Sequence, residues 1–148
     1  MTDILSIYNC GFNKHLGLRV VEVCKTRAVV ELEIKPEHLQ PHGFVHGGVT
    51  LALLETAASA ATCANADLET EYPFGVGINV KHKKPGVEGV LRASAELESE
   101  SISEYSGALK QTWRICATDM AGDVISEGTF ESKIVSKEYL ARRHKGYS

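Results

Sequence analysis

The sequence predicts an α+β fold, with a curved antiparallel sheet wrapped around one long central helix. Residues 47–65 are rich in alanine and leucine and carry a single charged side chain, which is typical of a helix buried on nearly all sides. The segments before and after this helix alternate apolar and polar residues, as half-buried strands do. Short turns join the later segments, which favours antiparallel pairing and excludes a doubly wound nucleotide-binding sheet.

The N-terminal third supplies a helix and two strands. Residues 2–9 are expected to form a short helix with Thr2 as its N-cap. Residues 16–23 and 28–35 are expected to form two strands, and the second alternates apolar and charged side chains, which predicts one buried face. Residues 36–45 then form a loop that contains two prolines and a glycine.

The period of two returns after the central helix. The first run is expected to place four apolar residues on one face of a strand: Phe74, Val76, Ile78 and Val80. Three further strands are expected at 90–99, 109–118 and 124–134. A short basic helix over 136–144 is expected to follow the last strand.

Composition excludes several classes of protein. The 148 residues are interpreted as a single domain, 1–148, without repeats or a linker. Sixteen basic and nineteen acidic residues give a net charge of −3, so no nucleic-acid partner is expected. The start lacks the pattern of a signal peptide and residues 47–66 are too polar for a membrane span, so no membrane partner is expected. The four cysteines form no close pair, which favours free thiols in the cytoplasm.

Glu55 is the first candidate for chemistry, because it is the one charged residue between Gly47 and Ala66. Burial disfavours the charged form of a carboxylate, and a poised carboxylate is what a general base or a nucleophile requires. The alternative is that Glu55 lies on the single solvent-facing stripe of the helix. Composition leaves both interpretations open.

The second candidate is His46-Gly47-Gly48, where the loop becomes the helix. The first N–H groups of a helix have no internal partner, and the helix dipole favours negative charge there. The two glycines would let another group approach this backbone closely. Such a helix start can stabilise an oxyanion, although glycines are also ordinary residues at this position.

Helix geometry separates these two candidates. The nine residues from His46 to Glu55 rotate by about 180° and rise by roughly 13 Å, so one chain does not easily bring Glu55 to its own helix start. Ser59 follows Glu55 by four residues and shares its face. If both candidates serve one reaction, the site combines two chains, which predicts a dimer with its active site at the interface.

The remaining motifs are weaker. Three histidines recur at every fourth position: His38, His42 and His46. On a helix this spacing could align metal ligands, but Pro41 and Gly43 break such a helix, so no metal site is expected. The basic run 81–84 is either a solvated strand end or a site that holds phosphates.

Two motifs occur together, Gln40-x5-His46-Gly47-Gly48 and Glu55-x3-Ser59. With these spacings the chain resembles the hotdog-fold acyl-CoA thioesterases of the phenylacetate-degradation and hydroxybenzoyl-CoA thioesterase type. The resemblance covers about residues 10–135, and the segments 15–23 and 79–85 also fit it. It implies a hotdog fold and hydrolysis of an acyl-CoA thioester to a carboxylic acid and free CoA, with no cofactor.

The resemblance also implies roles for single residues. Glu55 matches the carboxylate that acts as nucleophile or general base, and Ser59 matches the hydroxyl beside it. The Gly47 N–H matches the donor that polarises the thioester carbonyl, while Gln40 and His46 match residues that position the thioester.

Three further residues are assigned to substrate binding, namely Gly48, His82 and Lys84, of which the last two match contacts to the CoA nucleotide and its phosphates. The resemblance implies a homodimer, often a dimer of dimers, in which one subunit supplies the Glu and Ser and the other the Gln, His and Gly. The Ser/Glu-rich stretch 98–107 is longer than the usual connection, which affects the CoA contacts near it.

Two other functions stay open. One is a non-catalytic acyl-CoA-binding module, although such sensors carry a DNA-binding domain and only about fifteen residues precede the first strand here. The other is a hotdog enoyl-CoA hydratase or dehydratase, which uses a different arrangement of His with Asp or Glu. The acyl group, the nucleophilic or general-base role of Glu55 and the choice between dimer and tetramer are left undecided by the sequence.

Overall fold

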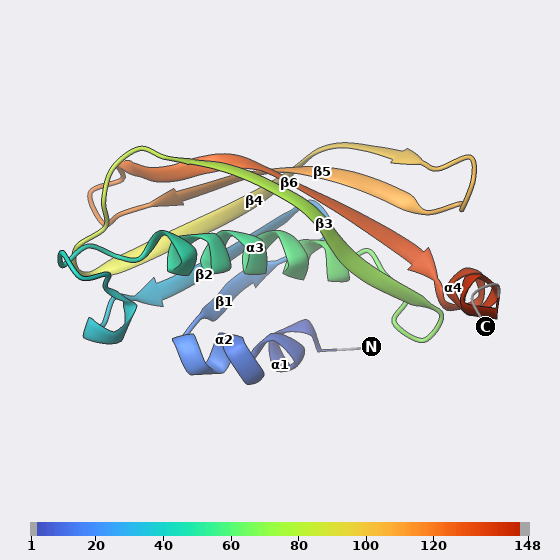
Figure 1. Ribbon diagram of the computed structural model, residues 1–148, viewed down its shortest axis with the longest axis horizontal. Coiled ribbons are helices and arrows are strands. Elements are labelled where there is room, and N and C mark those ends of the chain that lie inside the picture. The colour runs from blue at the N-terminus through green and yellow to red at the C-terminus, as the bar shows by residue number, and fades with distance from the viewer. Residues whose placement is uncertain (1–2, 146–148) are drawn as a thin grey trace.

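The computed structural model describes residues 3–145, which form five helices and six strands (Figure 1). The helices are α1 (Ile4–Tyr8), α2 (Gly11–Leu16), the 3-10 helix η1 (Pro36–His38), α3 (Gly47–Cys63) and α4 (Lys137–Lys145). The strands are β1 (Arg19–Val23), β2 (Arg27–Glu33), β3 (Glu71–His82), β4 (Val90–Ile102), β5 (Leu109–Thr118) and β6 (Val124–Ser136). No helix in the described range is long and apolar enough to span a membrane.

The six strands form one antiparallel sheet in the order β1-β2-β4-β5-β6-β3. The α3 helix connects β2 to β3, which lies at the opposite edge of the sheet. In Figure 1, α3 lies between the β5–β6 part of the sheet and the α1–α2 pair. The predicted arrangement of a curved antiparallel sheet around a central helix is therefore confirmed. Among residues 3–145 the strand β3 pairs only with β6, so its outer edge is open in this part of the chain.

The core lies between α3 and the concave face of the sheet. Four alanines of α3 are fully buried together with Leu53 and Leu54: Ala57, Ala58, Ala60 and Ala61. Their small side chains let the helix approach the buried Trp113 and Ile115 of β5. The face of α3 that packs against the sheet therefore consists mainly of small and apolar side chains, as the composition predicts.

One buried polar group ties the end of α3 to the sheet. The Ser132 hydroxyl accepts a hydrogen bond from Trp113 Nε1 at 3.1 Å and lies 3.0 Å from Thr62 Oγ1. Thr62 Oγ1 also lies 2.8 Å from the Ala58 carbonyl oxygen. All three side chains are buried, and each of their polar atoms has a hydrogen-bond partner in this network.

The N-terminal helix begins later than expected. Thr2 lies outside the described residues, and Asp3 caps α1 by accepting a hydrogen bond from the Leu5 N–H at 3.1 Å. A second short helix, α2, takes the place of the start of the expected strand 16–23, so β1 begins at Arg19. The central helix ends at Cys63, two residues before the expected end, and α4 covers nearly the expected range.

The prediction that Phe74, Val76, Ile78 and Val80 share one face is wrong, because β3 contains a bulge between Gly75 and Gly77. Ile78 lies opposite the buried Phe130 of β6, whereas Phe74 lies opposite Lys133. Since residues 130 and 133 point to opposite faces of β6, Phe74 and Ile78 also point to opposite faces. The bulge leaves Phe74 and Val76 exposed at the open edge of the sheet.

Gly128 allows β6 to approach β3 closely. A Cβ atom at this position would lie 1.8 Å from the Asn79 carbonyl oxygen, a backbone atom that cannot move independently of its strand. We therefore expect Gly128→Ala to lower the free energy of unfolding by about 3 kcal/mol, the upper range for an overpacked interior position. Urea denaturation followed by circular dichroism measures this loss.

Gly77→Ala is the matched control, because the nearest atom to its added Cβ is a Glu131 carboxylate oxygen at 3.3 Å, the far end of a flexible side chain. The control should unfold close to the wild-type midpoint. Equal midpoints for both variants would contradict the close approach at Gly128.

Candidate active site

The loop before α3 is held in a tight turn that begins at Gln40. The Gln40 N–H donates to the Phe44 carbonyl at 2.7 Å, and the Gly43 N–H donates to the Gln40 carbonyl at 3.0 Å. Gly43 has a φ of +89°, a conformation that glycine adopts without strain. The Gln40 side-chain oxygen accepts a hydrogen bond from the His42 N–H. Its amide nitrogen is therefore the group that remains to donate to a ligand.

His46 is the N-cap of α3. Its Nδ1 atom accepts a hydrogen bond from the Gly48 N–H at 2.9 Å. A Cβ atom on Gly48 would lie only 3.0 Å from this nitrogen, so the glycine admits the capping ring. The Gly48 donor is thereby used, whereas the Gly47 N–H has no acceptor within residues 3–145. The free donor at the helix start is Gly47, one of the two glycines that the sequence singled out.

A cavity of about 340 Å³ lies at this helix start, between the Gln40 loop and the end of β3. The His82 ring borders it and packs directly on Gly47, since a Cβ atom there would lie 3.0 Å from His82 Nε2. The opposite ring nitrogen, Nδ1, lies 2.7 Å from the Ser126 hydroxyl, which fixes the ring orientation. The structure thus brings Gln40, Gly47 and His82 together around one cavity.

Lys84 lies at the rim of the same cavity but already has two partners. Its Nζ atom is 2.9 Å from Asp119 Oδ2 and 2.6 Å from Asp123 Oδ2. The hydrogen bonds to Asp123 and then Asp119 raise the pKa of Lys84, and the hydrogen bond from Lys84 lowers the pKa of Asp119. The sequence shows an acidic turn at 119–123, but its contact with Lys84 depends on the fold. A phosphate at Lys84 would have to compete with these carboxylates.

Glu55 and Ser59 lie elsewhere, on the face of α3 that meets β3. The Glu55 side chain is exposed, although Leu54 and Thr56 beside it are buried. This is the solvent-facing alternative of the two that composition left open. Glu55 Oε1 lies 3.6 Å from where a Gly75 Cβ atom would be, so the carboxylate stands at the bulge of the open edge strand.

A second cavity, of about 130 Å³, adjoins this face of α3. It is lined by Ser59 and Thr62 of α3, by Tyr8 of α1, by Phe130 of β6 and by the bulge segment 73–75 of β3. None of the described residues lines both this cavity and the one at the helix start. Within one chain the predicted site residues therefore form two separate groups.

The three histidines that recur at every fourth residue lie in different surroundings. His38 is buried; its Nδ1 accepts from the Lys35 N–H at 2.9 Å and its Nε2 lies 2.7 Å from the Leu16 carbonyl oxygen. His42 is exposed in the loop, and His46 caps α3. Among the described residues no group of three or more His, Cys, Asp or Glu side chains is placed to hold a metal ion.

Tyr8 is a residue near the site that the sequence did not indicate. Burial, followed by the charges of Cys63 and Glu55, raises the pKa of the Tyr8 hydroxyl far above its usual value, so the phenol stays protonated. A tyrosine in a short N-terminal helix has no motif that would single it out. Its place beside α3 is visible only in the folded chain.

Comparison with known proteins relates the chain to a protein family. A family model described as the thioesterase superfamily matches residues 42–101, a range that includes both glycines of the helix start, Glu55, Ser59, His82 and Lys84. The chain is 35% identical over 109 residues to the 1,4-dihydroxy-2-naphthoyl-CoA hydrolase of Listeria monocytogenes, a match that covers 74% of this chain and 83% of the relative. It is 28% identical over 108 residues to the proofreading thioesterase EntH of Klebsiella pneumoniae, covering 73% of this chain and 74% of that protein.

Solved structures agree on the fold. The chain superimposes on a thioesterase of Haemophilus influenzae with a TM-score of 0.77 at 21% identity, over 90% of this chain and 88% of that one. It superimposes on AziG of S. sahachiroi with a TM-score of 0.76 at 26% identity, over 86% of this chain and 98% of that one. The six-stranded sheet around α3 is thus the fold of these proteins.

Proposed function

This chain belongs to the thioesterase superfamily, has the hotdog fold and is a thioester hydrolase, and we propose that it hydrolyses an acyl-CoA thioester at a site shared by two copies of the chain. The observation that carries this proposal is the separation of the two half-sites. The free Gly47 N–H stands at one cavity, and the exposed Glu55 stands roughly 12 Å farther along α3 at the open edge strand. Neither half-site contains all the groups that the reaction needs.

The helix start supplies the electrophilic half of the proposed site. A thioester carbonyl oxygen placed at the Gly47 N–H would accept its hydrogen bond and lie at the positive end of the α3 dipole. The amide nitrogen of Gln40 is free to donate to the same oxygen, because the His42 N–H occupies only the side-chain oxygen. His46 acts by capping the helix and so orienting Gly47.

Glu55 supplies the other half. As a general base it takes a proton from water while the water oxygen bonds to the carbonyl carbon, and collapse of the tetrahedral oxyanion breaks the carbon–sulfur bond and releases CoA thiolate, which then takes up the proton. As a nucleophile its carboxylate bonds to the carbonyl carbon, and collapse of the tetrahedral oxyanion breaks the carbon–sulfur bond and expels CoA thiolate to leave an anhydride. Water then hydrolyses the anhydride, which regenerates the Glu55 carboxylate and releases the carboxylic acid, and the thiolate takes up a proton from this water. Ser59, one turn further on the same face, is placed to hydrogen-bond the water or the carboxylate.

The open edge of β3 supports the two-chain arrangement. Four apolar residues of this strand are more than a third exposed: Tyr72, Phe74, Val76 and Ile78. An exposed apolar edge strand is a template for pairing with a second copy. A two-fold axis beside β3 would pair the two strands antiparallel and set the two α3 helices antiparallel, so that Gly47 of one chain approaches Glu55 of the other.

The rest of the proposal follows from this arrangement. The CoA moiety would extend from Gly47 into the cavity bordered by His82 and Lys84, with Gly48 contributing by admitting the His46 cap. Such dimers are proposed to pair further into tetramers. The four cysteines are free thiols, which supports the proposed cytoplasmic location.

Glu55→Gln tests the role of the carboxylate. The amide keeps the shape of the side chain and removes both its basicity and its nucleophilicity, so kcat on a panel of acyl-CoA thioesters should fall about 100-fold or more. Free CoA is measured with a thiol reagent, and circular dichroism verifies the fold. Wild-type kcat in a folded Glu55→Gln protein would remove Glu55 from the mechanism, and thioester binding without CoA release by the wild type would indicate a binding module.

Subunit complementation tests the shared site. One inactive protein carries Glu55→Ala, and the other carries Gln40→Ala with His46→Ala. A mixed dimer contains one complete site and one site that lacks the Glu55, Gln40 and His46 side chains, so random exchange should restore about a quarter of the wild-type activity per chain. Exchange demonstrated by native mass spectrometry without any recovery would show that each chain builds its own site.

Lys84 and its two partners make the CoA contact testable. Lys84→Ala should raise KM for an acyl-CoA roughly threefold or more with little change in kcat, because a phosphate contact far from the reacting bond contributes mainly uniform binding. Asp123→Asn removes one competing carboxylate and should lower KM for the same substrate. The control substrate is the acyl-pantetheine thioester, which lacks the nucleotide phosphates. Equal effects on both substrates would contradict a phosphate contact at Lys84.

A further inference from the structure

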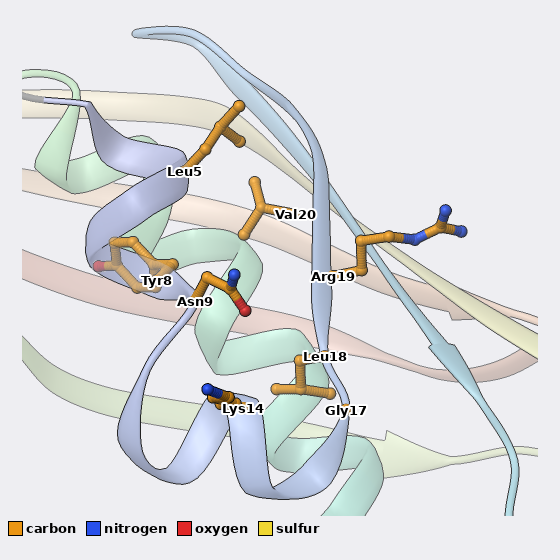
Figure 2. A pocket seen from close by; sticks show the side chains of 8 residues that line it. All are labelled: Leu5, Tyr8, Asn9, Lys14, Gly17, Leu18, Arg19 and Val20. Carbon is orange, nitrogen blue, oxygen red and sulfur yellow. The ribbon is translucent and has the colours of Figure 1, made fainter.

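Tyr8 lines two cavities. One is the cavity of about 130 Å³ beside Ser59 and Gly75. The other is an open cavity of about 390 Å³ lined by residues of α1, α2 and the start of β1. Within the described part of the chain, Tyr8 is the one residue that lines both. Figure 2 shows the larger cavity, with Leu5, Leu18 and Val20 around its interior and the Arg19 side chain directed away from it.

The smaller cavity, called here the inner cavity, lies next to the proposed reaction centre. Ser59 lines it, and Glu55 lies one turn before Ser59 on α3. Gly75 also lines it, and a Cβ atom on Gly75 would lie 3.6 Å from Glu55 Oε1. A thioester whose carbonyl carbon is within reach of Glu55 would therefore direct its acyl group into the inner cavity.

We propose that Tyr8 limits the size of the acyl group, because its ring closes the inner cavity and separates it from the larger cavity beside α1 and α2. This proposal rests on the proposed thioesterase reaction. The enzyme then favours acyl groups with a single aromatic ring or a short chain. Two-ring acyl groups and medium-length chains would collide with the Tyr8 ring. Removal of that ring would join the two cavities and admit them.

The dimensions support this limit. An apolar cavity of about 150 Å³ is known to hold one benzene molecule, so the inner cavity of about 130 Å³ matches one ring or a few methylene groups. Phe130 and Pro73 contribute apolar atoms to its wall, although polar atoms make up the larger part of its exposed lining. The larger cavity offers a further apolar lining from Leu5, Leu18 and Val20, with Asn9 and Lys14 at its polar part.

The position of Tyr8 is held by contacts of the N-terminal helices. The Asp3 cap fixes the start of α1, and the Thr56 hydroxyl of α3 donates to Asn13 Oδ1 of α2 at 3.2 Å. Thr56 adjoins Glu55 in sequence, so this hydrogen bond anchors α2 beside the reacting carboxylate. The phenol ring is also neutral at all working pH values, because burial raises its pKa. A neutral ring held in this way can serve as a steric wall.

The test compares kcat/KM for benzoyl-CoA and 2-naphthoyl-CoA in the wild type, Tyr8→Ala, Tyr8→Leu and Tyr8→Phe. We expect the wild type to favour benzoyl-CoA, and the naphthoyl-to-benzoyl ratio to rise on the order of tenfold in Tyr8→Ala and to rise also in Tyr8→Leu. Tyr8→Phe keeps the ring and should keep the wild-type ratio. Leu5→Ala is the matched control, because Leu5 lines only the larger cavity and should leave the ratio unchanged while Tyr8 is present.

An unchanged ratio in Tyr8→Ala and Tyr8→Leu, both folded by circular dichroism, would overturn the proposal. So would a wild type that already prefers the naphthoyl ester. If the wild type hydrolyses neither ester nor any other acyl-CoA, the thioesterase proposal fails instead. The size limit is then tested by the Kd values of the benzyl-CoA and naphthylmethyl-CoA thioethers, whose binding requires no reaction. The same naphthylmethyl-to-benzyl Kd ratio in the wild type and in Tyr8→Ala would overturn the size limit. Failure of both thioethers to bind would also overturn it.

Discussion

The burial of α3 inside the curve of the sheet is the constraint on which the rest of the structure depends. The four fully buried alanines let the sheet close around the helix, and β2, β4, β5 and β6 all contact it. Such a helix has almost no position for a charge. Glu55 occurs where the cover is incomplete, next to the open edge of β3. The proposed reacting carboxylate therefore lies at the open edge of the sheet, where the second copy of the chain is proposed to pair.

Close approaches at glycines shape both half-sites. At the helix start, Gly47 leaves room for the His82 ring against a backbone whose N–H remains free. At the bulge of β3, a Cβ atom on Gly75 would meet Phe130 Cζ at 2.6 Å, so the absence of a side chain keeps the space beside Glu55 open. In both places a glycine leaves room next to a group that is proposed to react. The geometry of the site thus depends as much on these glycines as on the polar residues.

The N-terminal helices connect stability with selectivity. Helices α1 and α2 pack beside α3 and close off space that the sheet does not cover, and the Asn13–Thr56 hydrogen bond joins them to the helix that carries Glu55. Their packing places Tyr8 where it lines two cavities. The same contacts that bury apolar surface would then define how large an acyl group the proposed site accepts.

The sequence by itself determined the antiparallel sheet, the central helix and the distance between Gly47 and Glu55, because these follow from local periodicity and from the rise and rotation of a helix. The two short motifs around Gly47 and Glu55 were sufficient to indicate the family. Only the tertiary structure decided the bulge at Gly75–Gly77, the pairing of Lys84 with Asp119 and the position of Tyr8. Each of these depends on the pairing of distant segments, which brings together groups that no local pattern connects. Lys84 and Asp119, for example, are 35 positions apart in the sequence. Such contacts are selected by the free energy of packing the whole chain, which no short stretch of sequence contains.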